Sequence, residues 1–147
     1  MMALEKKDWT LLALALADGK PLSPVQLQKV VFLFQKMMPA NTATSDYYNF
    51  TPYNYGPFCS AVYDDANALA EEGLAKVGLA APQGYRDYSA TPQGVAAGTK
   101  LAATLSSDTT EYASKLVEWV IQQSFAGLVS AIYEKFPEYK VNSVFRD

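Results

Sequence analysis

The chain has 147 residues, of which 50% are hydrophobic and 13% aromatic, and its net charge is −3. A chain of this length favours one domain with a well-buried core, and its composition excludes a disordered protein. The acidic balance argues against a nucleic-acid-binding surface, which needs basic side chains.

Cysteine content and hydropathy indicate the cellular context. The single cysteine, Cys59, excludes an internal disulfide and a multi-cysteine metal site, and one free thiol is typical of a reducing compartment. No apolar run approaches the ~18 residues that a membrane-spanning helix needs. The apolar stretch near the N-terminus is followed by Asp18 and Gly19, not by a signal-peptide cleavage site. We therefore expect a cytoplasmic protein with no membrane partner.

Hydrophobic periodicity and capping residues predict six helices and one hairpin. The expected helices cover residues 5–17, 24–38, 57–73, 92–105, 108–123 and 126–136. The expected strands cover residues 74–77 and 85–89, joined by a loose tip at residues 78–84. We expect a loop at residues 40–46 and an irregular tail at residues 137–147.

The second helix has the clearest start signal in the chain. Ser23 is placed as its N-cap, Pro24 as its first residue, and Gln26 completes a capping box. The helix should end at Pro39. Lys29 and Lys36 lie seven residues apart, so they should project on roughly one side, away from the apolar face.

The aromatic segment, residues 47–58, is the part around which we expect the other elements to pack. It contains six aromatic residues and should form short extended pieces bent at Pro52. The third helix should begin at Pro57 and end at Gly73. We expect Phe50 and Phe58 to be buried, whereas the tyrosines of this region could belong either to the core or to an interface.

The order of elements is that of a winged helix, in which three helices precede a two-stranded hairpin. We expect a mainly α protein in one domain, with a winged-helix-like core at residues 5–90 whose wing is the short β-hairpin. A C-terminal helical extension should follow at residues 91–136. This architecture serves both DNA binding and protein binding, so it does not identify a function.

The sequence lacks histidine and the common catalytic motifs. There is no histidine, so the commonest general base and metal ligand is absent, and no phosphate-binding loop or nucleophile motif occurs. Cys59 should lie in the first turn of the third helix as a small buried side chain. Asp65 and Glu72 share one side of that helix, where we expect a solvated acidic face. We expect no enzyme, no metal and no cofactor.

Duplex DNA is not the expected partner. The third helix would enter the major groove of DNA, yet residues 57–73 contain no Lys or Arg and four acidic side chains. A DNA-binding mode would have to use the sparse set Lys29, Lys36, Lys76 and Arg86.

Protein recognition is the alternative that the tyrosines favour. The chain has ten tyrosines, a residue type enriched at interfaces because it combines an apolar ring with a hydroxyl. We expect the partner-binding surface to include Tyr53, Tyr55, Tyr63 and Asp64, with Lys29 as an outer neighbour. On this interpretation Asp64 would contact a basic group of the partner, and a homodimer is a further option.

Three motifs resemble those of a group of small prokaryotic proteins. They are LQKVVFLFQ, YNFTPYNYGPF and VYDDANALAEEGL, which contain Leu27-Gln28-Lys29, Tyr55-Gly56-Pro57 and Val62-Tyr63. The group comprises the YwgA-like family and, more distantly, the SocA-like antitoxins with a Panacea domain. The segment FPEYKVNS is similar to the closing segment of the YwgA-like group.

The resemblance implies a winged-helix-like core and a protein that neutralises a toxin by direct contact or assists its removal. We therefore expect a non-enzymatic protein-interaction module, such as an antitoxin-like neutraliser or a regulator in a prokaryotic or phage defence or stress system. The alternative is a winged-helix DNA-binding transcriptional regulator.

Overall fold

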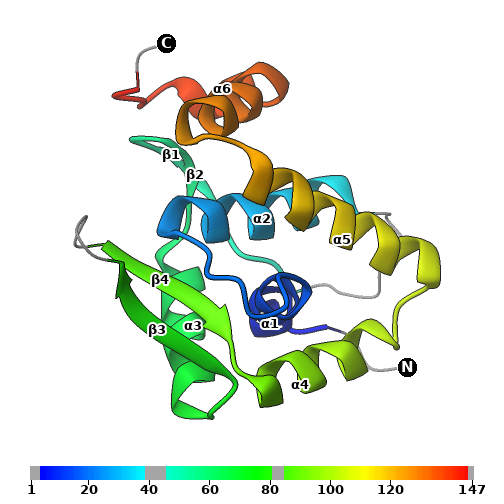
Figure 1. Cartoon of the computed structure of the whole chain (residues 1–147). Coiled ribbons are helices and arrows are strands. Elements are labelled where there is room, and N and C mark those ends of the chain that lie inside the picture. The colour runs from blue at the N-terminus through cyan, green and yellow to red at the C-terminus, as the bar shows by residue number, and fades with distance from the viewer. Residues whose placement is uncertain (1–3, 39–45, 81–84, 146–147) are drawn as a thin grey trace.

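The computed structural model describes residues 4–38, 46–80 and 85–145 (Figure 1). The helices are α1 (Lys6–Leu16), α2 (Pro24–Met37), α3 (Ser60–Glu71), α4 (Pro92–Ala102), α5 (Ser107–Gln122) and α6 (Phe125–Lys135), followed by the 3₁₀ helix η1 (Pro137–Lys140). The strands are β1 (Thr51–Tyr53), β2 (Gly56–Phe58), β3 (Ala75–Ala80) and β4 (Tyr85–Ala90). The predicted mainly α fold with a short β-hairpin wing is confirmed. The expected helix end at Pro39, most of the loop at 40–46 and the hairpin tip around Pro82 lie outside the described residues.

The wing is the antiparallel hairpin β3–β4, which pairs Ala75 with Ala90 at its base. Leu22, just before α2, exchanges two backbone hydrogen bonds with Tyr88 of β4, at 2.7 and 2.9 Å. The wing is therefore attached to the start of α2. None of the helices in the described ranges is long and apolar enough to cross a membrane.

A second hairpin, β1–β2, replaces the helix start that the sequence predicted at Pro57. Thr51 pairs with Phe58 and Tyr53 with Gly56, and α3 begins only at Ser60. Gly56 has a φ of +104°, a conformation that glycine adopts without strain, and this allows the chain to turn back. Gln28 of α2 then holds Cys59 in an extended conformation, so Cys59 is the N-cap of α3 and not part of its first turn.

Helix α1 lies in the middle of the helical layers, with α4 below it and α2 above it in the view of Figure 1. It is buried on several sides, including Trp9, Leu12 and Leu14. Gly98 of α4 lies so close to Ala15 that a side-chain carbon at this position would overlap that residue. Helix α5 packs along α2. The segment 91–136, expected as an extension, therefore supplies two walls of the main core.

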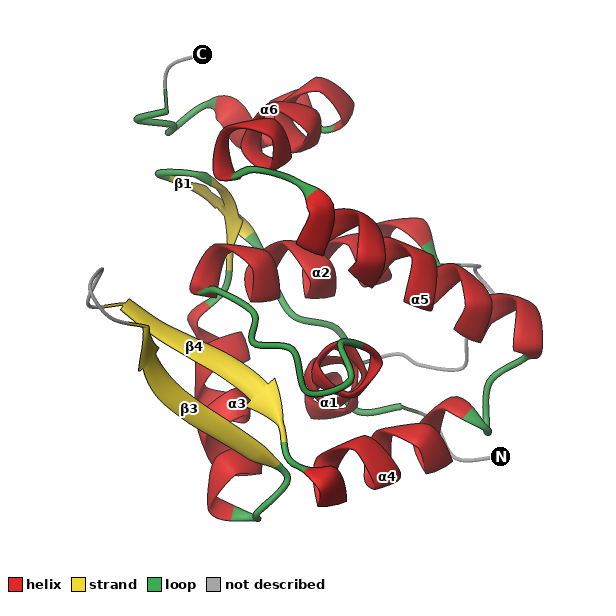
Figure 2. Ribbon diagram, viewed as in Figure 1, coloured by secondary structure: helices red, strands yellow, loops and turns green. Residues whose placement is uncertain are grey.

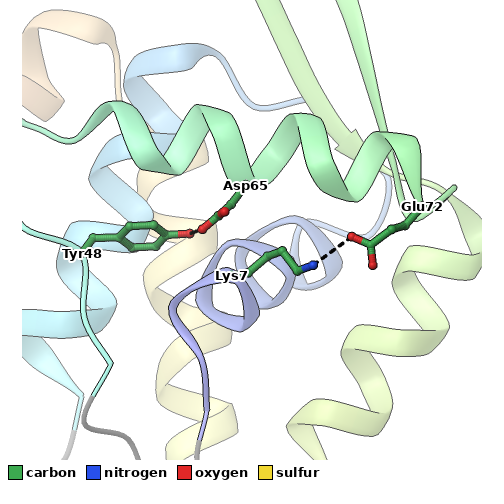
Figure 3. A network of polar contacts seen from close by, with 4 residues as sticks. All are labelled: Lys7, Tyr48, Asp65 and Glu72. Carbon is green, nitrogen blue, oxygen red and sulfur yellow. Dashed lines mark hydrogen bonds and ion pairs between the residues drawn. The ribbon is translucent and has the colours of Figure 1, made fainter.

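The side of α3 that faces α1 carries a polar network (Figure 3). The Tyr48 hydroxyl donates to Asp65 at 2.6 Å, so the Thr10 hydroxyl, 2.7 Å from the same oxygen, is the donor to Tyr48. Lys7 forms an ion pair with Glu72 at 2.9 Å. The expectation of a solvated face is wrong for Asp65, which is half-buried, whereas Glu72 is exposed as expected. Helix α1 supplies polar partners to both side chains, Thr10 through Tyr48 to Asp65 and Lys7 to Glu72.

The segment after α6 is more ordered than the sequence predicted. Residues 137–140 form η1, and the rings of Phe136 and Tyr139 pack edge-on against Phe32 of α2, with centroids 5.0 and 4.9 Å away. The backbone amide of Val144 donates to Asn54 in the β1–β2 turn at 3.0 Å. Figure 2 shows α6 and the C-terminal segment beside this hairpin. The tail thus packs on α2 through aromatic rings and is hydrogen-bonded to the β1–β2 turn. Its apolar residues do not follow a helical period, so no sequence pattern indicated this packing.

Candidate partner-binding surface

The β1–β2 hairpin presents large aromatic side chains to solvent. Tyr53 is 51% exposed and Tyr55 is 41% exposed, and Phe125 at the start of α6 is 46% exposed. The centroids of the Tyr55 and Phe125 rings are 5.1 Å apart, so hairpin and helix share one surface. We call the exposed residues Tyr53, Tyr55 and Phe125, with the pocket beside them, the hairpin surface.

A row of ring contacts connects this surface to the wing. Tyr53 packs on Phe58 at 4.9 Å, Phe58 on Tyr63 at 5.9 Å, and Tyr63 is stacked on Tyr88 of β4 at 5.7 Å between centroids. The expected burial of Phe50 and Phe58 is met in part, because both are half-buried. The row extends from exposed Tyr53 to buried Tyr88 and supports the exposed end from below.

A pocket of about 140 Å³ opens beside the hairpin. Helix α2 provides one wall, the β1–β2 turn another, and Tyr63 of α3 closes it. The lining residues are Val25, Gln28, Lys29, Tyr53, Asn54, Tyr55, Gly56, Phe58 and Tyr63. The pocket is therefore apolar and aromatic on most sides, with amide groups and one amine among its polar atoms.

Lys29 is the charged side chain of this pocket and is only 3% exposed. Its ammonium donates to the carbonyl oxygen of Pro57 at 3.0 Å. Within the described ranges no carboxylate forms an ion pair with it. Burial lowers the pKa of Lys29 to about 7, because the charged form loses hydration.

The expected position of Lys29, as an outer neighbour of the binding surface, is wrong. The helical pattern of α2 predicts only one apolar face, but β1–β2 covers a second side of the helix. All residues from Leu27 to Phe34 are consequently buried. Lys29 lies beneath the surface and not at its edge.

Two glutamines of α2 hold the backbone at the two ends of the aromatic segment, and the sequence patterns gave neither of them this role. Gln28 donates to the carbonyl of Cys59 at 2.8 Å and accepts from its amide at 3.0 Å. Gln35 makes the same pair of bonds with Tyr48, at 3.0 and 2.8 Å. Each side-chain amide donates to the carbonyl and accepts from the amide of one backbone residue, as a neighbouring β-strand would. Their seven-residue spacing is the signal that could have identified them.

Tyr63 and Asp64 differ in position. Tyr63 is half-buried, and its hydroxyl donates to the carbonyl of Pro24 at 3.2 Å. Burial raises the pKa of Tyr63 to about 12. Tyr63 thus packs against the core, because the wing and the N-terminus of α2 cover that side of α3. Asp64 is exposed but does not line the pocket.

The residues of the alternative DNA-binding mode are not equivalent. Lys36, Lys76 and Arg86 are exposed, whereas Lys29 is buried. The exposed face of α3 is formed by Ser60, Asp64, Asn67 and Glu71. That face has no cation to meet a phosphate.

Groups that would bind a metal are not gathered in the part of the chain that the structure describes: no three His, Cys, Asp or Glu side chains cluster there. Cys59 is a half-buried free thiol at the N-cap of α3. No protein-family model matches the chain, and no curated protein matches it either. The resemblance to the YwgA-like and Panacea groups therefore remains an expectation from the motifs.

Proposed function

We propose that this protein is a non-enzymatic interaction module that binds another protein through the hairpin surface. The observation that carries the proposal is the group of exposed rings, Tyr53, Tyr55 and Phe125, around a pocket with a buried cation. Exposed aromatic groups of this kind mark interaction sites, since tyrosine and phenylalanine lose little rotamer entropy on binding and remove much apolar area from water.

The support beneath these rings favours binding because it reduces the entropy lost on association. The backbone next to the hairpin is fixed by Gln28, the carbonyl of Pro57 by Lys29, and the turn by Val144. A partner would meet a surface that already has its bound shape. Surfaces organised in this way supply hot spots, in which a few aromatic residues provide most of the affinity.

The role we propose is that of an antitoxin-like neutraliser, or of a regulator, in a prokaryotic or phage defence or stress system. It depends on the resemblance, and the contacts of the motif residues support it. Lys29 of the Leu-Gln-Lys motif binds the carbonyl of Pro57, which belongs to the Tyr-Gly-Pro motif, and Gln28 binds the backbone of Cys59 two residues later. The motif residues thus help to build the hairpin surface.

A DNA-binding transcriptional regulator is the second candidate. Lys76 and Arg86, both exposed on the wing, favour it. The acidic exposed face of α3 opposes it, because a carboxylate near the phosphates is repelled where a winged helix normally makes its base contacts.

The experiment that tests the proposal compares partner capture by matched variants. Wild-type protein would be cross-linked in its native host, and the captured protein identified by mass spectrometry and purified. The variant Tyr53→Ala/Tyr55→Ala should bind this purified partner at least tenfold more weakly, since each truncated hot-spot ring costs about 2 kcal/mol or more.

The control is Tyr47→Ala, which removes an exposed tyrosine outside the hairpin and should leave affinity within about twofold. Equal binding by the double variant and the wild type would reject the hairpin surface as the interface. Fluorescence anisotropy with duplex DNA addresses the second candidate. Sub-micromolar, salt-sensitive DNA binding that is lost in Lys76→Ala/Arg86→Ala would favour it over protein recognition.

A further inference from the structure

Within the described ranges, the amine of Lys29 has one hydrogen-bond acceptor, so part of its donor capacity is unused there. An ammonium group has three donors, and the carbonyl of Pro57 accepts one of them. The side chain lines the pocket, is only 3% exposed, and has no acidic partner among the residues described. A buried charge without a counter-charge is costly, so an anion in the pocket would be strongly favoured.

We propose that this pocket receives a carboxylate of the partner protein, bound by the Lys29 ammonium and enclosed by the rings of Tyr53 and Tyr55. The identity of the ligand as part of a partner rests on the function proposed above. The carboxylate is either an Asp or Glu side chain or a chain end, which share the same chemistry.

The size and lining of the pocket select this ligand. A volume of about 140 Å³ accommodates one side chain, but not a nucleotide or a sugar. Phosphate groups are usually bound by several cations or backbone amides, whereas this pocket has one amine, so a singly charged carboxylate is the better match. The exposed rings at the mouth exclude water once a partner covers them, and this strengthens the charge-assisted bond.

Among the residues that the structure describes, the side chains that face Lys29 carry no negative charge that would compensate its ammonium group. The hairpin contributes the phenols of Tyr53 and Tyr55, and α3 contributes that of Tyr63. Helix α6 contributes Tyr133, whose ring flanks Gly56 together with the Lys29 amine and is also a phenol. On α2 the neighbouring lining residues Val25 and Gln28 are neutral. A bound carboxylate would therefore be the nearest negative charge, and by linkage it must raise the pKa of the amine that binds it.

The pH dependence of binding follows from the pKa of about 7 in the free protein. Below this pH Lys29 is charged, and a carboxylate remains ionised down to pH ~4. Above it, the charged fraction of the free protein falls about tenfold per pH unit. Binding should thus be at least about tenfold weaker at pH 9 than at pH 6, because a rise of one unit in the Lys29 pKa on binding corresponds to a tenfold change in affinity.

The test uses three small probes and the full chain labelled on its lysine side chains for NMR. The probes are N-acetylglutamate methylamide, with a side-chain carboxylate; N-acetylleucine, with a chain-end carboxylate; and N-acetylglutamine methylamide, the neutral isostere. At pH 6 at least one acid should shift the Lys29 resonance in a saturable way and raise its pKa by about one unit or more. The glutamine probe should not, and the stronger acid identifies the source of the carboxylate.

Lys29→Met is the matched variant, because methionine keeps the unbranched stem and removes the charge. It should bind the acidic probe at least about tenfold more weakly, the loss expected for one charge-assisted hydrogen bond. Lys36→Met, an exposed lysine on the same helix, should bind as the wild type does. If Lys29→Met does not fold, the shift of the Lys29 pKa that the acidic probes cause in wild-type protein tests the site by itself.

Several outcomes overturn the carboxylate site: no saturable shift of Lys29, equal shifts with the neutral probe, or tighter binding of inorganic phosphate. Its failure is separable from failure of the proposed function, because the probes need no partner. Probe binding at Lys29 combined with partner capture that ignores Tyr53 and Tyr55 would refute the interface. Loss of partner capture in the tyrosine variant without probe binding would refute only the carboxylate site.

Discussion

Helix α2 carries the same dipeptide twice, Gln28-Lys29 near its start and Gln35-Lys36 near its end, and the two pairs have different environments. Each glutamine binds one backbone residue through two hydrogen bonds, Gln28 at Cys59 just after the aromatic segment and Gln35 at Tyr48 within it. Lys29 is buried in a pocket, whereas Lys36 is exposed, with its ammonium 5.9 Å from the centroid of the Phe32 ring. The seven-residue repeat gives both lysines the same helical phase. The elements that pack on α2 therefore determine which of the two lysines is buried.

The cover over the first pair is the β1–β2 hairpin. Burying a lysine reduces stability unless its charge is compensated. The first pair therefore combines a stabilising glutamine–backbone pairing with a desolvated ammonium group. The second pair has the glutamine–backbone pairing, and its ammonium group is hydrated. The repeated dipeptide thus gives both glutamines the same backbone-binding role, whereas the tertiary fold removes water from Lys29 alone.

The largest loss of stability is expected for Phe32, which lies on α2 between the two dipeptides. The centroid of its ring is 4.9–5.3 Å from those of Phe50, Phe136 and Tyr139. Phe32→Ala should lower the free energy of unfolding by about 3–5 kcal/mol, because it removes a fully buried ring and leaves a cavity. Denaturant unfolding measures this loss. A change below about 1 kcal/mol would contradict the packing of the tail on α2.

The second prediction is that the free energy of unfolding depends on pH through Lys29 and not through Lys36. Burial depresses the pKa of Lys29 in the folded state below its unfolded value, so the unfolded state binds more protons between about pH 7 and 10. Stability should rise with pH in this window, by up to about 1.4 kcal/mol per unit, and be flat below about pH 7.

Lys29→Met should remove this slope, and its largest stabilisation relative to wild type should occur at or below about pH 7. Lys36→Met should retain the wild-type slope, because Lys36 is hydrated in both states. Denaturant midpoints at about pH 7.5, 8.5 and 9.5 compare the three proteins. Parallel pH curves for all three would show that the ammonium of Lys29 is not desolvated.

The sequence predicted more of the fold than of the site. Helix α2 is an example of success: Ser23, Pro24 and Gln26 form the expected capping box because these signals act within one turn. The start of α3 was misplaced at Pro57, since a proline suits both a first helical turn and an edge strand. Gln28, 31 residues away in the chain, determines the outcome by pairing with Cys59.

The site depends on contacts of this long-range kind. The exposure of Tyr53 and Tyr55 agrees with the sequence-based interpretation, which left their role open. The burial of Lys29 and the half-burial of Tyr63 result from elements that pack on α2 and α3 from elsewhere in the chain. Helical periodicity describes only one apolar face, so it assigns a residue under a second covering layer to solvent.

A smaller effect compares the two glutamine clamps directly. Gln28→Ala and Gln35→Ala should each cost about 1–3 kcal/mol, because each leaves a backbone amide and carbonyl without a partner. Only Gln28→Ala should also weaken partner capture, since Cys59 follows directly on the hairpin, whereas Tyr48 belongs to the core. Unfolding and binding measured on both variants check this. Equal losses of binding would mean that the whole aromatic segment moves as one unit.

The smallest change in stability is expected at the helix caps. Ser23 accepts a hydrogen bond from the amide of Gln26 at 3.2 Å, and Ser106 at the start of α5 accepts one from Thr109 at 3.1 Å. Replacing either by alanine should cost about 1 kcal/mol of unfolding free energy, because one amide of the first turn loses its partner.

The two variants should differ in their effect on the pKa of Lys29 in the pocket. Loosening the first turn of α2 lets water approach Lys29 further along the same helix, so Ser23→Ala should raise the Lys29 pKa slightly, whereas Ser106→Ala on another helix should leave it unchanged. NMR titration of Lys29 in both variants measures the difference, and the same pKa in both would show that the hairpin alone keeps water from the amine.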